Sequence, residues 1–183
     1  MSSSETPANA SPERADSQPS TSPPAGSLRI SSERGEVDFA AIHRFLATQS
    51  PWAAGIPEAT LRRALDHSIC CSGHIDGEMI AFARAITDQA TFAYLADVFV
   101  APSQRGHGYG RTIVAALMAD PRLQGLRRWH LVTSDMQRLY QGFGFVELSQ
   151  PERHMQKHDP DVYRRAVDAQ ARDPASTDPL PAP

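Results

Sequence analysis

Cysteine is scarce in this sequence, and apolar runs of membrane-spanning length are lacking. The two cysteines, Cys70 and Cys71, are adjacent, which suits neither a disulfide between them nor the ligand spacing of a zinc site. No apolar stretch approaches the length of a transmembrane helix, and the first residues lack the basic and apolar regions of a secretory signal. We therefore expect reduced thiols, a cytoplasmic location and no membrane partner.

An excess of positive charge is lacking too. The formal net charge is -3 at pH 7, and the sequence pI is about 6.1. Nucleic-acid binding depends on a clustered basic face that neutralises phosphates. We therefore expect no nucleic-acid partner. The charge is compatible with binding of a small acidic or neutral ligand.

Large apolar residues are rare at both ends of the chain. Residues 1–27 are rich in Ser, Pro and Ala, and residues 161–183 become similar in character toward their end. Such segments bury too little apolar surface to offset the entropy cost of ordering them. We expect a disordered arm over 1–27, one domain over 28–160, and a largely disordered tail over 161–183.

The sequence between these ends alternates strand and helix patterns. Apolar residues in 36–50 recur at helical spacing, Pro57 can begin a helix, and Asp76-Gly77 suits a tight hairpin. In chain order we predict strand 28–32, helices 36–50 and 57–68, strands 68–75, 79–86 and 91–101, helix 110–120, strand 127–133, helix 135–144, and strand 145–149 paired with a last strand around 152–158.

Three glycines on alternate positions, Gly106, Gly108 and Gly110, lie between the apolar run YLADVFV and the helical pattern TIVAALM. The first amides of a helix have no intrahelical acceptor and attract anions, and glycine lets the backbone approach a ligand closely. This loop therefore predicts a phosphate-binding nest. It lacks the lysine of a Walker loop and the third glycine of GxGxxG, which disfavours a nicotinamide cofactor.

The pattern Arg105-x-x-Gly108-x-Gly110, followed by LYQGFGF at 139–145, resembles the GNAT superfamily of N-acetyltransferases, whose pyrophosphate signature is [QR]-x-x-G-x-[GA]. The resemblance covers about residues 28–158 and is nearest to a small bacterial subfamily. It implies an α+β fold in three layers, in which a mixed, mostly antiparallel sheet of six to seven strands has helices on both faces and strands four and five splayed. It further implies acetyl-CoA as cosubstrate and is compatible with a homodimer.

The resemblance also implies which residues bind the donor. The backbone of the strand before the loop would hold the pantetheine arm, and the loop amides would hold the pyrophosphate. Side chains of Arg105 and Arg111 could add charge or lie in solvent, and His107 is expected to contribute through its backbone. The residues that the resemblance implies for binding acetyl-CoA are Val98, Phe99, Val100, Arg105, Gly106, His107, Gly108, Tyr109, Gly110 and Arg111.

Acetyl transfer to an amine needs an uncharged amine, a polarised carbonyl and a proton for the departing thiolate. The tyrosine of the LYxxFGF pattern commonly supplies that proton in the family, which assigns the role of general acid to Tyr140. A tyrosine that is neutral at pH 7 can give this proton. The alternative is a tyrosine that only packs on its helix. Carbonyl polarisation is assigned, again by resemblance, to the N–H of Val100.

The general base is less clearly marked. YLADVFV resembles the corresponding strand of polyamine acetyltransferases, in which a Glu-Asp pair stands at the positions of Ala96 and Asp97 and the glutamate assists deprotonation. Alanine replaces that glutamate here. Asp97 is therefore a catalytic and acceptor-binding candidate that could orient a cationic amine, or an aspartate that only hydrogen-bonds the strand.

The acceptor would lie against the linker SPWAAGIP at 50–57 and the end of the 127–133 strand, with Trp52 and Ser134 as binding residues. Asp135 precedes a helix and is expected to cap it. His154 and His158 have helical spacing but no third ligand in view, so we expect no metal. We expect a small-molecule primary amine as acceptor; a non-catalytic acyl-CoA sensor and a protein N-acetyltransferase stay as alternatives.

Overall fold

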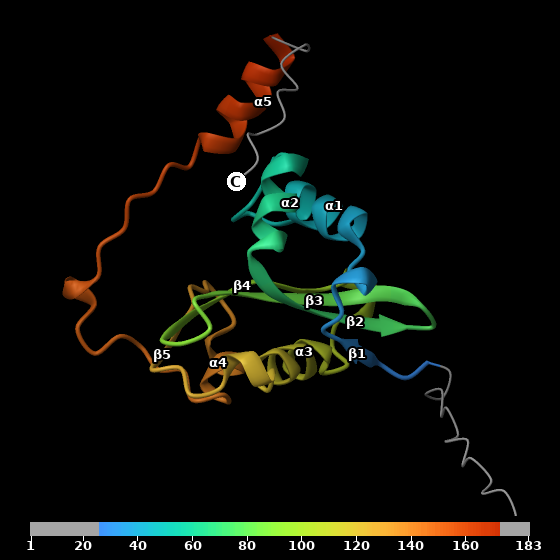
Figure 1. The fold of residues 1–183 in the computed structure, drawn as a ribbon, viewed down its shortest axis with the longest axis vertical. Helices are drawn as coiled ribbons and strands as arrows, with labels where there is room; N and C mark the ends of the chain where they lie inside the picture. The colour runs from blue at the N-terminus through green and yellow to red at the C-terminus, as the bar shows by residue number, and fades with distance from the viewer. Residues whose placement is uncertain (1–25, 173–183) are drawn as a thin grey trace, which may run out of the picture.

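The computed structural model describes residues 26–172 and contains a five-stranded sheet in the order β1-β2-β3-β4-β5 (Figure 1). Strands β1 to β4 pair antiparallel, and β5 pairs parallel to β4. The mixed, mostly antiparallel sheet of the expected fold is confirmed, with five strands in place of six to seven. The strands are β1 Arg29–Ser31, β2 Ser68–Ile75, β3 Glu78–Thr87, β4 Phe92–Val100 and β5 Arg128–His130.

Helices cover both faces of this sheet, as expected (Figure 1). The helices α1 (Phe39–Gln49) and α2 (Glu58–Asp66) lie on one face, and α3 (Tyr109–Met118) and α4 (Gln137–Gln141) lie on the other. Asp38 begins α1 by accepting a hydrogen bond from the amide of Ala41 at 2.9 Å, a normal N-cap. None of the helices within residues 26–172 is both long and apolar enough to cross a bilayer.

The strands predicted at 145–149 and 152–158 are not formed, and β5 is shorter than its predicted range of 127–133. Alternating side chains make these segments competent for strand pairing, but a strand also needs a neighbour that completes its hydrogen-bond ladder. Within the described residues, β5 pairs with β4 alone, and 145–149 and 152–158 enter no ladder. The two predicted strands at 145–149 and 152–158 were therefore wrong, and the predicted range of β5 was too long.

The part of the expected tail that the structure describes contains the helix α5 (Val162–Arg172). Tyr163 and Val167 stand four residues apart on one face of this helix, and Tyr163 packs against the cluster beneath α1 and α2. Short ion pairs of Arg164 with Asp161 and of Arg165 with Asp159 accompany the first turn. The expected disordered segments at 1–25 and 173–183 lie outside the described residues.

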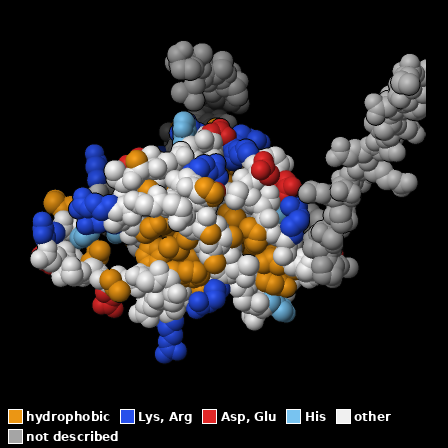
Figure 2. Space-filling view, turned by 60° about the horizontal axis from the view of Figure 1, so that its bottom comes forward, with side chains coloured by type: hydrophobic (Ala, Val, Ile, Leu, Met, Phe, Trp, Pro, Cys, Tyr) orange, Lys and Arg blue, Asp and Glu red, His pale blue; other side chains and the backbone are white. Residues whose placement is uncertain are grey.

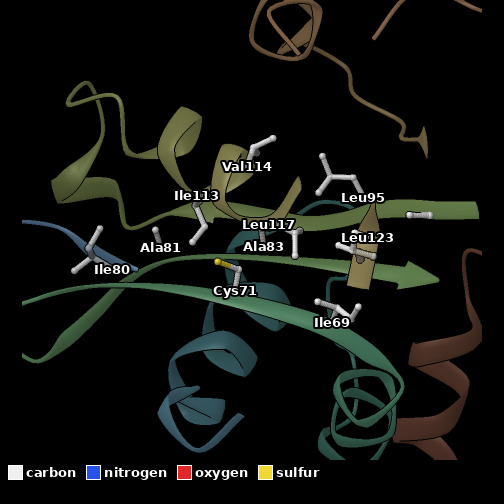
Figure 3. Close-up of a cluster of buried hydrophobic side chains, with 12 residues drawn as sticks. Ile69, Cys71, Ile80, Ala81, Ala83, Leu95, Ile113, Val114, Leu117 and Leu123 are labelled. Atoms are coloured by element: carbon white, nitrogen blue, oxygen red, sulfur yellow. The ribbon is translucent and has the colours of Figure 1, made fainter. Parts of the chain in front are cut away.

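Two apolar clusters hold the layers together. One lies between the sheet and α3 and includes Ile113, Val114 and Leu117 (Figure 3). The other lies between the sheet and α1 and α2, where Phe45 stacks on Phe99 of β4 with ring centroids 4.0 Å apart. The position of β4 is therefore set from both faces.

Both cysteines lie inside these clusters and are free thiols. Burial raises the pKa of Cys71 to about 11 and also raises that of Cys70. A thiol is a nucleophile only as its thiolate, so neither side chain is prepared for covalent catalysis.

The strands β4 and β5 separate after three paired positions. The parallel ladder ends at Tyr94 and His130, while β4 continues to Val100. Opposite Ala83 of β3, β4 carries a bulge at Asp97 and Val98, and Asp97 has a left-handed φ of 51°. The predicted splay of strands four and five is confirmed, and the gap opens beside the bulge.

We predict that Phe45→Ala lowers the free energy of unfolding by about 3 kcal/mol, because it removes a buried ring and leaves a cavity against Phe99. Urea denaturation followed by circular dichroism measures this change. Phe92→Ala is the control, since Phe92 is 39% exposed at the start of β4. An equal loss in both variants would contradict the importance of the Phe45–Phe99 stack.

Candidate functional site

The loop between β4 and α3 gathers unpaired amides. Gly106 and Gly108 have left-handed φ values of 84° and 82°, and Gly108 is the N-cap of α3. Among residues 26–172, no backbone oxygen accepts from the amides of residues 106–110. The Arg111 amide differs from the prediction, because it donates to the Gly108 oxygen at 3.0 Å. Five amides at a helix start form a concave donor site suited to an anion.

The edge of β4 that faces away from β3 carries further backbone donors. Ala101 N–H donates to the Ile80 oxygen at 2.7 Å, and N–H groups along an antiparallel strand alternate between its two sides. The N–H and C=O of Val100 therefore point away from β3, toward the gap. Arg105 confirms this direction, because its Nε donates to the Val100 oxygen at 3.2 Å.

A first pocket of about 540 Å³ lies beside this loop. Nine of the ten residues predicted to bind acetyl-CoA line it. The exception is His107, whose ring stacks on that of Tyr109 with centroids 5.5 Å apart. The complete lining is Phe45, Trp52, Val98, Phe99, Val100, Gln104, Arg105, Gly106, Gly108, Tyr109, Gly110, Arg111, Asp135, Met136, Leu139 and Tyr140. We call it the donor pocket.

Arg111 links α3 to the end of α4. Its guanidinium lies against Gly142, where an added Cβ would come within 2.7 Å of one Nη atom, and its Cζ is 5.4 Å from the centre of the Phe143 ring. A Cβ at position 142 would displace the guanidinium from this contact. Arg111 therefore places a positive charge on the donor pocket and also positions the helix that carries Tyr140.

A second pocket of about 590 Å³ lies on the other side of Trp52 and Tyr140. It shares five residues with the donor pocket: Trp52, Val98, Asp135, Met136 and Tyr140. Its remaining wall comes from Arg84 and Ile86 of β3, from β4, from residues 131–134 after β5, from the α1–α2 linker and from Tyr163 of α5. We call it the acceptor pocket. The two pockets meet where β4 and β5 separate.

Tyr140 stands at this junction. Its ring packs edge-on against Phe145 with centroids 6.0 Å apart, and within residues 26–172 its hydroxyl has no hydrogen-bond partner. Burial, and then the negative charge of Asp135, raises the pKa of Tyr140 above its usual value. The hydroxyl is therefore neutral at pH 7 and free to interact with a ligand at the meeting point of the two pockets.

Asp97 is fully engaged by two neighbours. Its Oδ2 accepts from Arg84 Nε at 2.6 Å, and its Oδ1 accepts from Trp52 Nε1 at 3.0 Å. The side chains of Asp97 and Arg84 are only 8% and 12% exposed. Both carboxylate oxygens already accept a hydrogen bond. The geometry therefore favours a role for Asp97 in orienting Trp52 over the predicted catalytic role. Through this contact, the β4 bulge fixes Trp52 of the α1–α2 linker.

The predicted acceptor residues Trp52 and Ser134 both line the acceptor pocket. Asp135 does not cap α4 as expected: the N-cap is Met136, and the hydroxyl of Thr133 accepts the Met136 amide at 3.1 Å. The side chain of Asp135 lines both pockets instead. The predicted N-cap role of Asp135 was therefore wrong, because Thr133 accepts the hydrogen bond at the start of α4.

Other lining residues were missed by sequence reasoning. Phe45 and Tyr163 come from elements far from the glycine loop in sequence, so no local pattern could indicate them. Leu139 directly precedes Tyr140 in LYQGFGF and could have been inferred from that motif. In the part of the chain that the structure describes, no three His, Cys, Asp or Glu side chains gather closely enough to hold a metal ion.

Comparisons with known proteins agree with this geometry. The model of the Acetyltransferase (GNAT) family matches residues 38–145. A crystal structure from Xanthomonas campestris, assigned to the same family, is 45% identical, has a TM-score of 0.73, and aligns over 76% of this chain and 98% of that chain. A Gibberella zeae protein assigned to the acetyltransferases is 32% identical over 137 residues, 63% of this chain and 76% of its own length.

A more distant structure shares the fold alone. An aminoglycoside N-acetyltransferase solved in complex with CoA is 20% identical, has a TM-score of 0.53, and aligns over 75% of this chain and 98% of that chain. The fold of this chain therefore extends to proteins that bind CoA.

We predict that Asp97→Asn lowers the free energy of unfolding by about 3 kcal/mol, because it leaves the Arg84 charge buried without a counter-ion. Asparagine tolerates the left-handed φ of this position, so the backbone is not strained further. Urea denaturation measures the loss, and the double variant Arg84→Met, Asp97→Asn should recover part of it.

The exposed pair of Arg62 and Glu58 supplies the control for this cycle. Their side chains are 59% and 62% exposed and the atoms lie 3.6 Å apart, so Glu58→Gln should change stability little. If Asp97→Asn proved as harmless as Glu58→Gln, the proposed orienting role of Asp97 would be wrong.

Proposed function

Because this chain belongs to the Acetyltransferase (GNAT) family, we propose that it transfers an acetyl group from acetyl-CoA to the primary amine of a small molecule. The observation that carries the proposal is the position of Tyr140, whose free hydroxyl lies where the donor and acceptor pockets meet. A proton donor is needed at that point, since the thiolate of CoA leaves there.

The donor pocket fits the parts of acetyl-CoA in order. The amides of residues 106–110 suit the pyrophosphate, with the charges of Arg105 and Arg111 beside them. The outward backbone groups of β4 suit the pantetheine amides, which would add to the strand edge as a further strand does. Val100 N–H is positioned to donate to the thioester carbonyl oxygen, which gains negative charge during attack.

The reaction then proceeds by direct transfer. The cationic amine first loses a proton to water, and its neutral nitrogen then attacks the thioester carbonyl carbon, forming a C–N bond and a tetrahedral oxyanion. The C–S bond breaks as this intermediate collapses, and the thiolate takes the proton of the Tyr140 hydroxyl. The nitrogen loses its extra proton to water, which later returns a proton to Tyr140. No covalent enzyme intermediate is required, in agreement with the two buried thiols.

The acceptor pocket favours an amine with an apolar body. Trp52, Tyr94 and Tyr163 supply aromatic surface, and Leu131 and Val132 add aliphatic surface. The carboxylate of Asp97 is neutralised by Arg84, whereas Asp135 forms no ion pair among the described residues. Asp135 therefore provides the negative charge that attracts a cationic amine to the junction.

The test is release of CoA from acetyl-CoA with a panel of amines that includes arylalkylamines, polyamines, aminoglycosides and short peptides. We predict that Tyr140→Phe lowers kcat about 100-fold while the Kd for CoA stays unchanged, because only the proton donor is removed. Tight CoA binding without release for any amine would favour the sensor alternative, and release with peptides alone would favour a protein N-acetyltransferase.

The pH dependence follows from the raised pKa of Tyr140. A raised pKa keeps the hydroxyl protonated to higher pH, so the acid form is lost only above the usual tyrosine range of about 10. We therefore predict that kcat of the wild type does not fall between about pH 7 and pH 9.5. A decline within this interval, absent from Tyr140→Phe, would assign the proton donor a lower pKa and contradict this reading.

We also predict that Gly108→Ala raises the Kd for CoA about tenfold, because a Cβ at a φ of 82° strains the loop that presents the amides. Isothermal titration calorimetry with CoA measures the change. Gly125→Ala is the matched control: Gly125 also has a left-handed φ, 73°, and open space around it, but lies outside the donor pocket. Equal weakening by both substitutions would indicate a general loss of stability.

A further inference from the structure

The end of the described chain crosses from one side of the sheet to the other. Figure 2 views the molecule from the side of α3 and α4, where hydrophobic side chains gather, whereas Figure 1 shows α5 beyond α1 and α2. The connecting residues 146–160 are all exposed. The helix α5 begins at Val162, outside residues 38–145 that match the family model. The position of this helix is therefore a feature that the family match does not describe.

Tyr163 connects α5 to the core of the domain. Among the described side chains of this helix, it alone belongs to an apolar cluster, the one that lies between the sheet and α1 and α2. Val162 and Val167 of the same helix are 45% and 48% exposed, and the ion pairs that accompany its first turn stay within residues 159–165. A helix attached through few buried contacts opens at a low free-energy cost. The seating of α5 therefore depends on what Tyr163 contacts.

The acceptor pocket, which Tyr163 also lines, has a polar end and an aromatic end. The polar end is the junction with the donor pocket, because Asp135 and Tyr140 line both pockets. Tyr94, Ile86 and Tyr163 line the acceptor pocket and not the donor pocket, so they lie away from the junction. An acceptor therefore meets a carboxylate and a proton donor at one end, and two aromatic rings with an aliphatic side chain at the other.

Apolar surface in the acceptor pocket is left uncovered. Trp52, Ile86 and Val132 line this pocket and are 55%, 43% and 77% exposed. Exposed apolar groups that line a concave site indicate where the apolar part of a ligand binds. An aromatic ring is the group that fits best, since it covers a large apolar area and pairs with tyrosine rings edge-on or offset.

We propose that Tyr163 selects aromatic acceptors, and that α5 covers the acceptor pocket when an arylalkylamine is bound. This inference rests on the proposed function, because it specifies the amine that the site would take. The amine group would lie beside Asp135 and Tyr140, and the aromatic ring would contact Tyr94 and Tyr163. The bound ring gives Tyr163 a second partner, so the closed position of α5 becomes more populated. A linear alkylamine offers no ring to stack on and should close the helix less.

The kinetic test compares phenethylamine with hexylamine as acceptors for the full chain. Tyr163→Ala should raise KM for phenethylamine about tenfold, because the aromatic contact is lost, and change KM for hexylamine less than about threefold. The effect should fall on KM more than on kcat, since Tyr140 still supplies the proton. Tyr163→Phe keeps the ring and should restore the wild-type KM. Val162→Ala is the matched control, because Val162 belongs to α5 but lines neither pocket.

Hydrogen–deuterium exchange followed by mass spectrometry measures the cover without any turnover. In the presence of CoA, phenethylamine at about ten times its Kd should slow exchange of the α5 amides about tenfold, because the helix must leave the bound ring before it opens. Hexylamine at the same saturation should slow this exchange less. Amides of β2 are the internal reference, since this strand lines neither pocket. The measurement needs only the wild type, so it decides the matter even where Tyr163→Ala fails to fold.

Three outcomes would overturn the inference: an unchanged KM for phenethylamine in a folded Tyr163→Ala variant, an equal rise in KM for both amines, or exchange of α5 that phenethylamine slows no more than hexylamine does. Each of these outcomes would leave the proposed function intact in a wild type that releases CoA with an amine. Slower exchange of α5 with phenethylamine in a protein that releases no CoA with any amine would instead refute the proposed function and keep Tyr163 as a residue that binds arylalkylamines.

Discussion

The end of the β4–β5 ladder at Tyr94 and His130 is the constraint on which the site depends. Up to that point the two strands share hydrogen bonds, and beyond it β4 runs on alone with its outer edge open. The bulge at Asp97 lies just past the separation and turns that edge, so Val100 presents its backbone groups to the gap. Both pockets exist because this ladder stops.

The buried pair of Arg84 and Asp97 stabilises the separation. An ion pair this poorly exposed has lost its hydration, which is compensated only when both partners stay hydrogen-bonded, and here Asp97 accepts from Arg84 and from Trp52. The contact ties the α1–α2 linker to the bulge and sets Trp52 between the two pockets. Phe99 fixes the same strand from the side of α1 through its stack on Phe45. The candidate site and the core packing thus use the same stretch of β4.

The order of the first four strands and the glycine loop could be read from the sequence, because they depend on local patterns. Alternating apolar residues, the Asp76-Gly77 turn and the spacing of Gly106, Gly108 and Gly110 each act within a few residues. The strands predicted at 145–149 and 152–158 are absent, because a strand pattern forms a strand only where a neighbouring strand completes its ladder. Instead Pro151 begins a 3-10 turn between the two segments.

The sequence by itself determined the family, the glycine loop before α3 and the position of Tyr140 in its motif, because each depends on a short stretch of local sequence. Only the tertiary structure decided that Asp97 orients Trp52, that Asp135 lines both pockets without capping α4, and that Tyr163 reaches the acceptor pocket. The hydrogen bond of Trp52 to Asp97, for example, joins residues 45 positions apart in sequence. The physical reason is that a side chain's role depends on which donors and charges the fold brings to it, and no periodicity encodes a partner at that distance.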